Sequence, residues 1–136
     1  MGIVNAADWR TSVSSMPGPW TEATGFQASR EVSKQRAEAG GPEITTSGRV
    51  TQANPTTRRL FDSDRDSKLY QRYSKGERFA GTTITRQALT VDGVPIPGGK
   101  LVFTGCEVVS MNLPDGNANG TDNGVLEIVW SVGSVA

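Results

Sequence analysis

Apolar and polar residues alternate most regularly in the last part of the chain, where three segments have the period of a β-strand. The predicted strands are Phe79–Leu89, Leu101–Asn112 and Val125–Val132. In the last of them Leu126, Ile128 and Trp130 share one face, which is typical of a strand that is buried on one side. The joints between the segments are rich in Gly, Pro, Asn and Asp, as turns require. The pattern therefore predicts the core of an antiparallel β-domain.

A short helix is predicted before these strands, over residues 63–75. Ser63 is a suitable N-cap, and Asp64 and Asp66 lie in the first turn, where the helix dipole favours anions. Leu69 and Tyr73 lie on one face of this helix, so both are expected to pack against the sheet. The predicted core residues of the chain are Leu69, Tyr73, Cys106, Leu126, Ile128 and Trp130.

The first part of the chain is more polar and gives weaker patterns. Residues 1–20 lack a period and predict an arm, whose Trp9 and Trp20 pack on their own domain or on a neighbouring molecule. Thr24–Ala39 has the composition of a helix, but as a strand it is polar on both faces. Gly40–Asn54 is a loop or a loosely paired ribbon, and Pro55–Phe61 alternates like a strand.

Length and composition predict one domain with a small hydrophobic core. Its body is expected to comprise residues 21–136, which follow the N-terminal arm. Only 35% of the 136 residues are hydrophobic, which predicts long arms or loops around a modest core. Lys and Arg together number 14, as do Asp and Glu, so the formal net charge is zero. Zero net charge favours self-association and does not suit a protein that grips nucleic acid.

Catalytic and metal-binding chemistry has little support in the sequence. The chain contains no histidine, and its single cysteine, Cys106, lies within a predicted strand as a buried thiol would. Asp62, Asp64 and Asp66 have the spacing of a calcium loop, but Ser67 and Tyr73 occupy the positions that need glycine and glutamate. We therefore expect no enzyme activity, no cofactor, no metal, no secretion signal and no membrane insertion.

Several strings, in this order and spacing, resemble the tail tube protein of long-tailed bacteriophages. They are SREVSKQRAEAGG, PTTRRLFDSDRD, TTITRQALTVDGVPIPGGKLVFTG and a final LEI, and they span about Gly25 to Val132. The resemblance implies a mainly β fold, a two-sheet antiparallel β-sandwich or barrel with one flanking helix, an N-terminal arm and a long loop over residues 37–54. Contractile injection and type VI secretion tubes share this fold. In the family, six subunits form a ring, and rings stack into a hollow tail that DNA passes through.

The resemblance also implies roles for individual residues. It makes Thr24–Arg36 a strand despite its helix propensity, because contacts with other subunits override such preferences. The expected channel-lining residues are Ser29, Glu31, Ser33, Thr83, Thr85 and Gln87. Because none of these side chains is basic, we expect a neutral to acidic channel that does not bind the phosphates of DNA. The expected contacts between rings are Trp9, Trp20, Glu38, Glu43 and Arg49. The arm and the loop are expected to become ordered only in the polymer.

Partners follow from the same resemblance. They are further copies of the chain, the tail tip, tape-measure and tail terminator proteins, and genomic DNA in transit. The protein would be made in the cytoplasm of a host bacterium and would reside in the virion tail. Two alternatives stay open: the inner tube of a contractile injection or secretion system, and a monomeric β-sandwich module that binds glycans through converging exposed aromatic residues.

Overall fold

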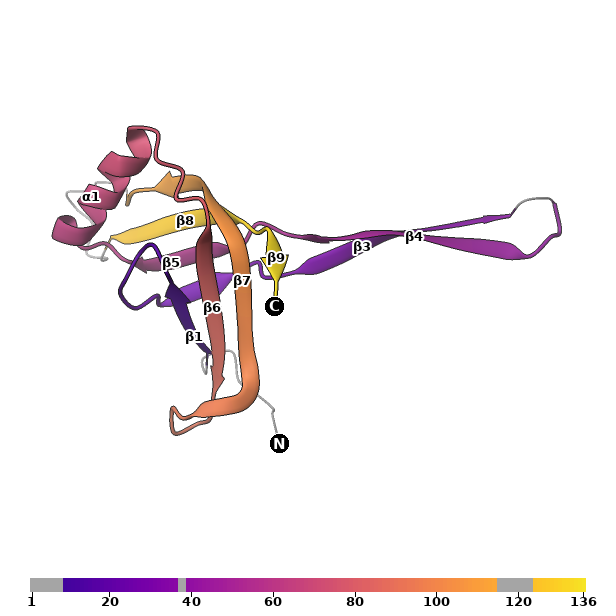
Figure 1. Cartoon of the computed structure of the whole chain (residues 1–136), viewed down its shortest axis with the longest axis horizontal. Coiled ribbons are helices and arrows are strands. Elements are labelled where there is room, and N and C mark those ends of the chain that lie inside the picture. The colour runs from indigo at the N-terminus through magenta and orange to yellow at the C-terminus, as the bar shows by residue number, and fades with distance from the viewer. Residues whose placement is uncertain (1–8, 37–38, 115–123) are drawn as a thin grey trace.

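The computed structural model describes residues 9–36, 39–114 and 124–136, and these form strands and one helix (Figure 1). The elements are β1 (Trp9–Val13), β2 (Glu22–Thr24), β3 (Ala28–Arg36), β4 (Glu43–Gln52), β5 (Thr56–Leu60), α1 (Ser63–Ser74), β6 (Thr82–Leu89), β7 (Pro95–Asn112), β8 (Val125–Ser131) and β9 (Ser134–Val135). All strand pairings are antiparallel within this part of the chain. The predicted fold class, mainly β with one short helix, is confirmed.

One long strand, β7, connects two layers of the body. The strand order is β1-β6-β7-β8-β5-β2, with β9 also on β7. The first part of β7 pairs with β6, and its last residues, from Glu107 to Asn112, pair with β8. Between these parts Gly105 has φ +65°, a left-handed conformation that glycine adopts without strain. Because the chain bends there, β6 runs across the direction of β5 and β8 in Figure 1, as in an orthogonal β-sandwich.

The core lies between these two layers. Leu126, Ile128 and Trp130 of β8 are fully buried, and the indole Nε1 of Trp130 donates to Thr57 Oγ1 at 2.9 Å. Of the other residues expected in the core, Leu69 and Cys106 are buried and Tyr73 is half-buried against the core. The hydroxyl of Tyr73 donates to the carbonyl of Val109, so its polar end is satisfied at the surface.

The N-cap of helix α1 lies one residue before Ser63, the residue predicted as the cap. Asp62, not Ser63, is the N-cap, because its extended backbone lets Oδ1 accept from the amides of Asp64 and Arg65. The pKa of Asp62 lies below its ordinary value because these amides donate to the ionised carboxylate. The predicted stop at Gly76 is confirmed by its φ of +105°.

Two expectations for the first part of the chain are wrong. The arm over residues 1–20 is part of the body from Trp9 onward, because Trp9–Val13 forms β1 beside β6. The long loop over residues 37–54 is largely strand, because Glu43–Gln52 forms β4 and pairs with β3. The alternative of a paired ribbon was the right one, and the predicted strand in Thr24–Arg36 is confirmed by β3 over Ala28–Arg36.

Candidate assembly surface

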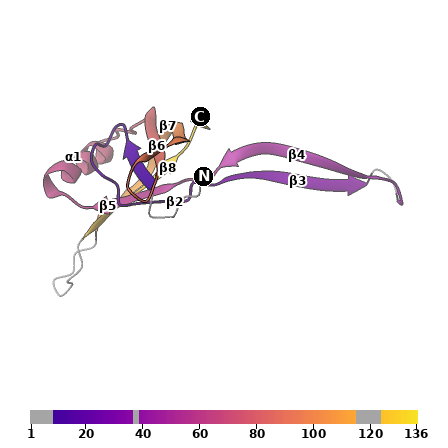
Figure 2. The same cartoon turned by 90° about the horizontal axis from the view of Figure 1, so that it is seen from below.

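Strands β3 and β4 form a hairpin that stands apart from the body; we call residues 28–52 the hairpin ribbon. It extends away from the other elements in both views (Figures 1 and 2) and is a separate two-stranded sheet. Val32 and Val50 are 52% and 50% exposed on it. A lone two-stranded ribbon is only marginally stable in water. Its extended form and exposed valines therefore suit a segment that another molecule covers.

The two faces of β3 differ in charge. Arg30, Lys34 and Arg36 alternate along one face together with Val32, while Ser29, Glu31 and Ser33 lie along the other. The pairing register shifts between Arg30 and Val32, so that Glu31 faces a bulge in β4 at Gly48. Strand β3 therefore has a basic face and a hydroxyl face with one carboxylate, and Glu43 of β4, the cross-strand partner of Arg36, adds a carboxylate to the basic face.

The six expected channel-lining residues fall on two separate sheets. Ser29, Glu31 and Ser33 are exposed on the ribbon, whereas Thr83, Thr85 and Gln87 are half-buried on the outer face of β6. The amide of Gln87 donates to carbonyls of the β6–β7 hairpin, at 2.9 Å for Ala88 and 3.2 Å for Ile96. The Gln87 side chain therefore holds the two strands of this hairpin together within its own subunit.

The outer face of β6 carries cations from its neighbours. Arg10 of β1 and Lys100 of β7 are in register with Gln87 from either side. Arg86 belongs to the opposite face of β6, where its guanidinium stacks on Trp9 and Phe26. A channel formed by this face would thus combine hydroxyl groups with two cations.

The expected contacts between rings occupy different environments. Trp20 is only 8% exposed, and the Arg59 guanidinium carbon lies 4.2 Å from the centre of its ring. Trp20 therefore packs mainly within its own subunit, and its role in contacts between rings stays a prediction. Trp9 is half-buried beside Arg86, Glu43 and Arg49 are exposed on the ribbon, and Glu38 lies outside the described residues.

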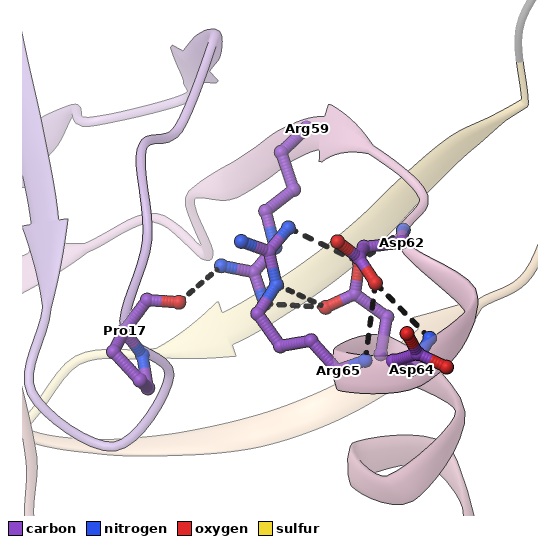
Figure 3. A network of polar contacts seen from close by, with 6 residues as sticks. Pro17, Arg59, Asp62, Asp64 and Arg65 are labelled. Atoms are coloured by element: carbon purple, nitrogen blue, oxygen red, sulfur yellow. Dashed lines mark hydrogen bonds and ion pairs between the residues drawn. The ribbon is translucent and has the colours of Figure 1, made fainter.

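A buried ion pair that the sequence did not predict fixes α1 to the body (Figure 3). Arg59 of β5 is 1% exposed, and its Nη2 lies 2.5 Å from Asp66 Oδ1 while its Nη1 donates to the carbonyl of Pro17 at 2.8 Å. Asp66 also accepts from Arg65 Nε at 3.2 Å and from the Asp62 amide at 2.9 Å. Burial lowers the pKa of Arg59 from its ordinary value, and the Asp66 carboxylate opposes this shift. The network joins the N-terminal segment, β5 and the helix.

The part of the chain that the structure describes offers little for catalysis or metal binding. It contains no group of three or more His, Cys, Asp or Glu side chains placed to hold a metal ion. Two of the three aspartates that have the spacing of a calcium loop are engaged in other contacts. Asp62 caps α1, and Asp66 pairs with Arg59. Cys106 is buried, and burial raises the pKa of its thiol, which disfavours the reactive thiolate. Helix α1, the one helix of the described residues, has neither the length nor the apolarity that a membrane crossing needs.

Comparison by sequence finds no matching family model and no matching curated protein. Comparison by structure finds chains of similar fold in assemblies that contain tubes. A chain of the PVC sheath–tube complex of an extracellular contractile injection system has a TM-score of 0.78 at 16% identity, covering 98% of this chain and 90% of that one. A chain from the tube-terminating cap of the anti-feeding prophage has a TM-score of 0.78 at 13% identity, with 98% and 89% covered.

A type six secretion system protein is more distant, with a TM-score of 0.60 at 18% identity, covering 96% of this chain and 82% of that one. At these identities the likeness shows the fold alone. It confirms the fold that the sequence resemblance implied, which tube proteins of contractile injection and type VI systems share.

Proposed function

We propose that this protein is the structural subunit of a hollow tube built from copies of itself. Six subunits would form a ring and rings would stack, as the resemblance to phage tail tubes implies. The fold supports this proposal, since nearly the whole chain aligns with chains from tube-containing assemblies.

The hairpin ribbon is the observation that carries the proposal. It spans 25 residues (28–52), and none of those that the structure describes belongs to the core of its own subunit. Its exposed Val32 and Val50 and its charged faces would be covered by the body of a neighbouring copy. A contact between a ribbon and a different surface is heterologous, so it propagates from copy to copy and builds rings or open stacks.

Two kinds of tube are compatible with this subunit. The sequence resemblance favours a bacteriophage tail tube in the virion, through which genomic DNA passes, with tail tip, tape-measure and terminator proteins as partners. The structural comparisons favour the inner tube of a contractile injection apparatus, because chains of such assemblies have TM-scores of 0.78 and 0.80 with this one. Ser29, Glu31, Ser33, Thr83, Thr85 and Gln87 remain the proposed lining of the channel in both.

A monomeric glycan-binding module has less support. Such a module needs aromatic side chains that converge on one exposed face. Trp130 and Trp20 are buried in the body, and Trp9 stacks on Arg86. Trp130 thus serves packing within the subunit, while Trp9 and Trp20 line one pocket in which Trp20 is almost fully buried.

The experiment is sedimentation and negative-stain microscopy of the purified full chain over a wide concentration range. The matched control replaces residues 29–51 by a short Gly-Ser turn, which Ala28 and Gln52 allow because they are direct cross-strand partners. We expect rings or stain-filled rods from the intact chain and folded monomers from the control. An intact chain that remains a monomer at high concentration would refute the proposal.

A further inference from the structure

A pocket of about 250 Å³ lies where the two edge strands of the body approach each other. Trp9 and Thr11 of β1 line it together with Glu22 and Thr24 of β2, and these strands are the two ends of the seven-stranded sheet. Edge strands present unpaired backbone N–H and C=O groups, which can pair with an added strand. The pocket is therefore flanked by backbone that suits an extended segment from another molecule.

Arg86 brings to this pocket a positive charge that no described residue pairs with. Its guanidinium carbon lies 4.6 Å from the Trp9 ring centre and 4.8 Å from that of Phe26, so the two rings fix its position. Its Nε is buried and has no hydrogen-bond acceptor among the described residues, and Arg86 forms no ion pair there. Trp20, which also lines the pocket, has a buried Nε1 that finds no acceptor in the described part of the chain. A fixed guanidinium with free donors is the arrangement that carboxylates bind.

Glu22, whose carboxylate lines this pocket, already pairs with Arg58. Glu22 Oε1 lies 3.1 Å from Arg58 Nη1, and the same guanidinium also binds Glu127 at 2.9 Å. Arg58 thus has two carboxylates while Arg86 has none within the described part of the chain.

Matching carboxylates are available on the hairpin ribbon. Glu31 and Glu43 are exposed on the ribbon, and neither forms an ion pair with a described residue. The ribbon projects away from its own body (Figure 1), so these carboxylates are presented to another copy.

We propose that the pocket at Arg86 receives a carboxylate from the hairpin ribbon of a second copy, while the ribbon lies along the edge strands β1 and β2. This inference rests on the proposed function, because it specifies the contact through which the copies join. Arg86 supplies the charge, and Trp9 and Phe26 hold it in place before the ribbon arrives. Preorganisation of this kind lowers the entropy cost of association.

The test reverses charges on both sides of the contact in the full-length protein. Arg86→Glu should raise the critical concentration for assembly at least about ten-fold, the factor that about 1.4 kcal/mol per contact represents. The charges of the two ribbon glutamates are reversed in separate variants, Glu31→Arg and Glu43→Arg. An equimolar mixture of Arg86→Glu with the correct ribbon variant should assemble, because every contact then places a carboxylate opposite a guanidinium.

Controls separate this inference from loss of folding and from failure of the proposed function. Lys68→Glu makes the same charge change on an exposed position of α1 and should leave the critical concentration unchanged. If Arg86→Glu does not fold, Arg86→Gln replaces it and should weaken assembly by a similar factor. Restoration by one ribbon variant supports the contact and identifies its carboxylate. Normal assembly of the Arg86 variants, or restoration by neither mixture, overturns it. A wild-type chain that never assembles refutes the proposed function instead.

Discussion

Removal of the Asp66 carboxylate should be among the most destabilising single changes in the body. Asp66 is fully buried and binds Arg59, Arg65 and the amide of Asp62. Asp66→Ala leaves the Arg59 guanidinium buried without a counter-ion, a change that typically costs about 3–5 kcal/mol. In a chain of this size each kcal/mol lowers Tm by about 3–5 °C, so the expected loss is about 9–25 °C.

The assay is urea unfolding of the variant that lacks residues 29–51, because assembly would otherwise add to the apparent stability. Arg59→Met should also destabilise, since it leaves Asp66 without its main partner. The double variant Arg59→Met/Asp66→Leu should lose less than either single variant, because neither charge then remains buried alone. Asp64→Ala, at an exposed position in the same helical turn, is the matched control. A loss below about 1 kcal/mol for Asp66→Ala, or strictly additive losses in the double variant, would refute the reasoning.

Three further changes test other parts of the structure. Asp62 has a pKa lowered by the amides of Arg65 and Asp64, so its stabilising effect is complete above its ordinary pKa and disappears as the pH falls through the lowered value. The wild-type Tm should therefore fall more than that of Asp62→Ala below about pH 4, and parallel curves would contradict this. Cys106 should react with a thiol reagent only after unfolding in urea, and rapid labelling of the native chain would contradict its burial. Val32→Thr with Val50→Thr should raise the critical concentration several-fold without changing the Tm of the monomer, and an unchanged critical concentration would mean that no copy covers these valines.

Predictions from sequence were most accurate where local pattern and burial coincide. The alternation of Leu126, Ile128 and Trp130 follows directly from the burial of one face of β8. The helix was also predictable, because its capping acids and Gly76 act within a few residues. Its cap was misplaced by one residue because Asp62 and Ser63 are both good N-caps and only the backbone conformation distinguishes them.

Elements stabilised by distant residues were harder to predict. Strand β1 buries Thr11 and Val13 against β6, but a buried threonine does not appear as part of an apolar face in the sequence. Strand β4 has only two large apolar residues, Ile44 and Val50, and Gly48 between them, so its pattern resembles that of a loop. Arg59 lies on the buried face of β5 because Pro17 and Asp66 accept hydrogen bonds from its Nη1 and Nη2, and neither contact is visible in the local pattern.

The hairpin ribbon shows why the assembly surface is only partly encoded in the local sequence. Helix propensity favours a helix over Thr24–Ala39, and the strand was predicted only through the resemblance to tube proteins. Which face of β3 meets a neighbour depends on the symmetry that relates the copies, and side-chain pattern within one chain does not contain that information.

The most direct test of the central claim is a cryo-electron microscopy reconstruction of the assembled full-length chain. The account predicts a hollow tube in which the ribbon of each copy, residues 28–52, lies on the body of another copy with Val32 and Val50 covered. A tube whose ribbons remain free in solvent, or a chain that forms no tube at concentrations where it is folded, would contradict it.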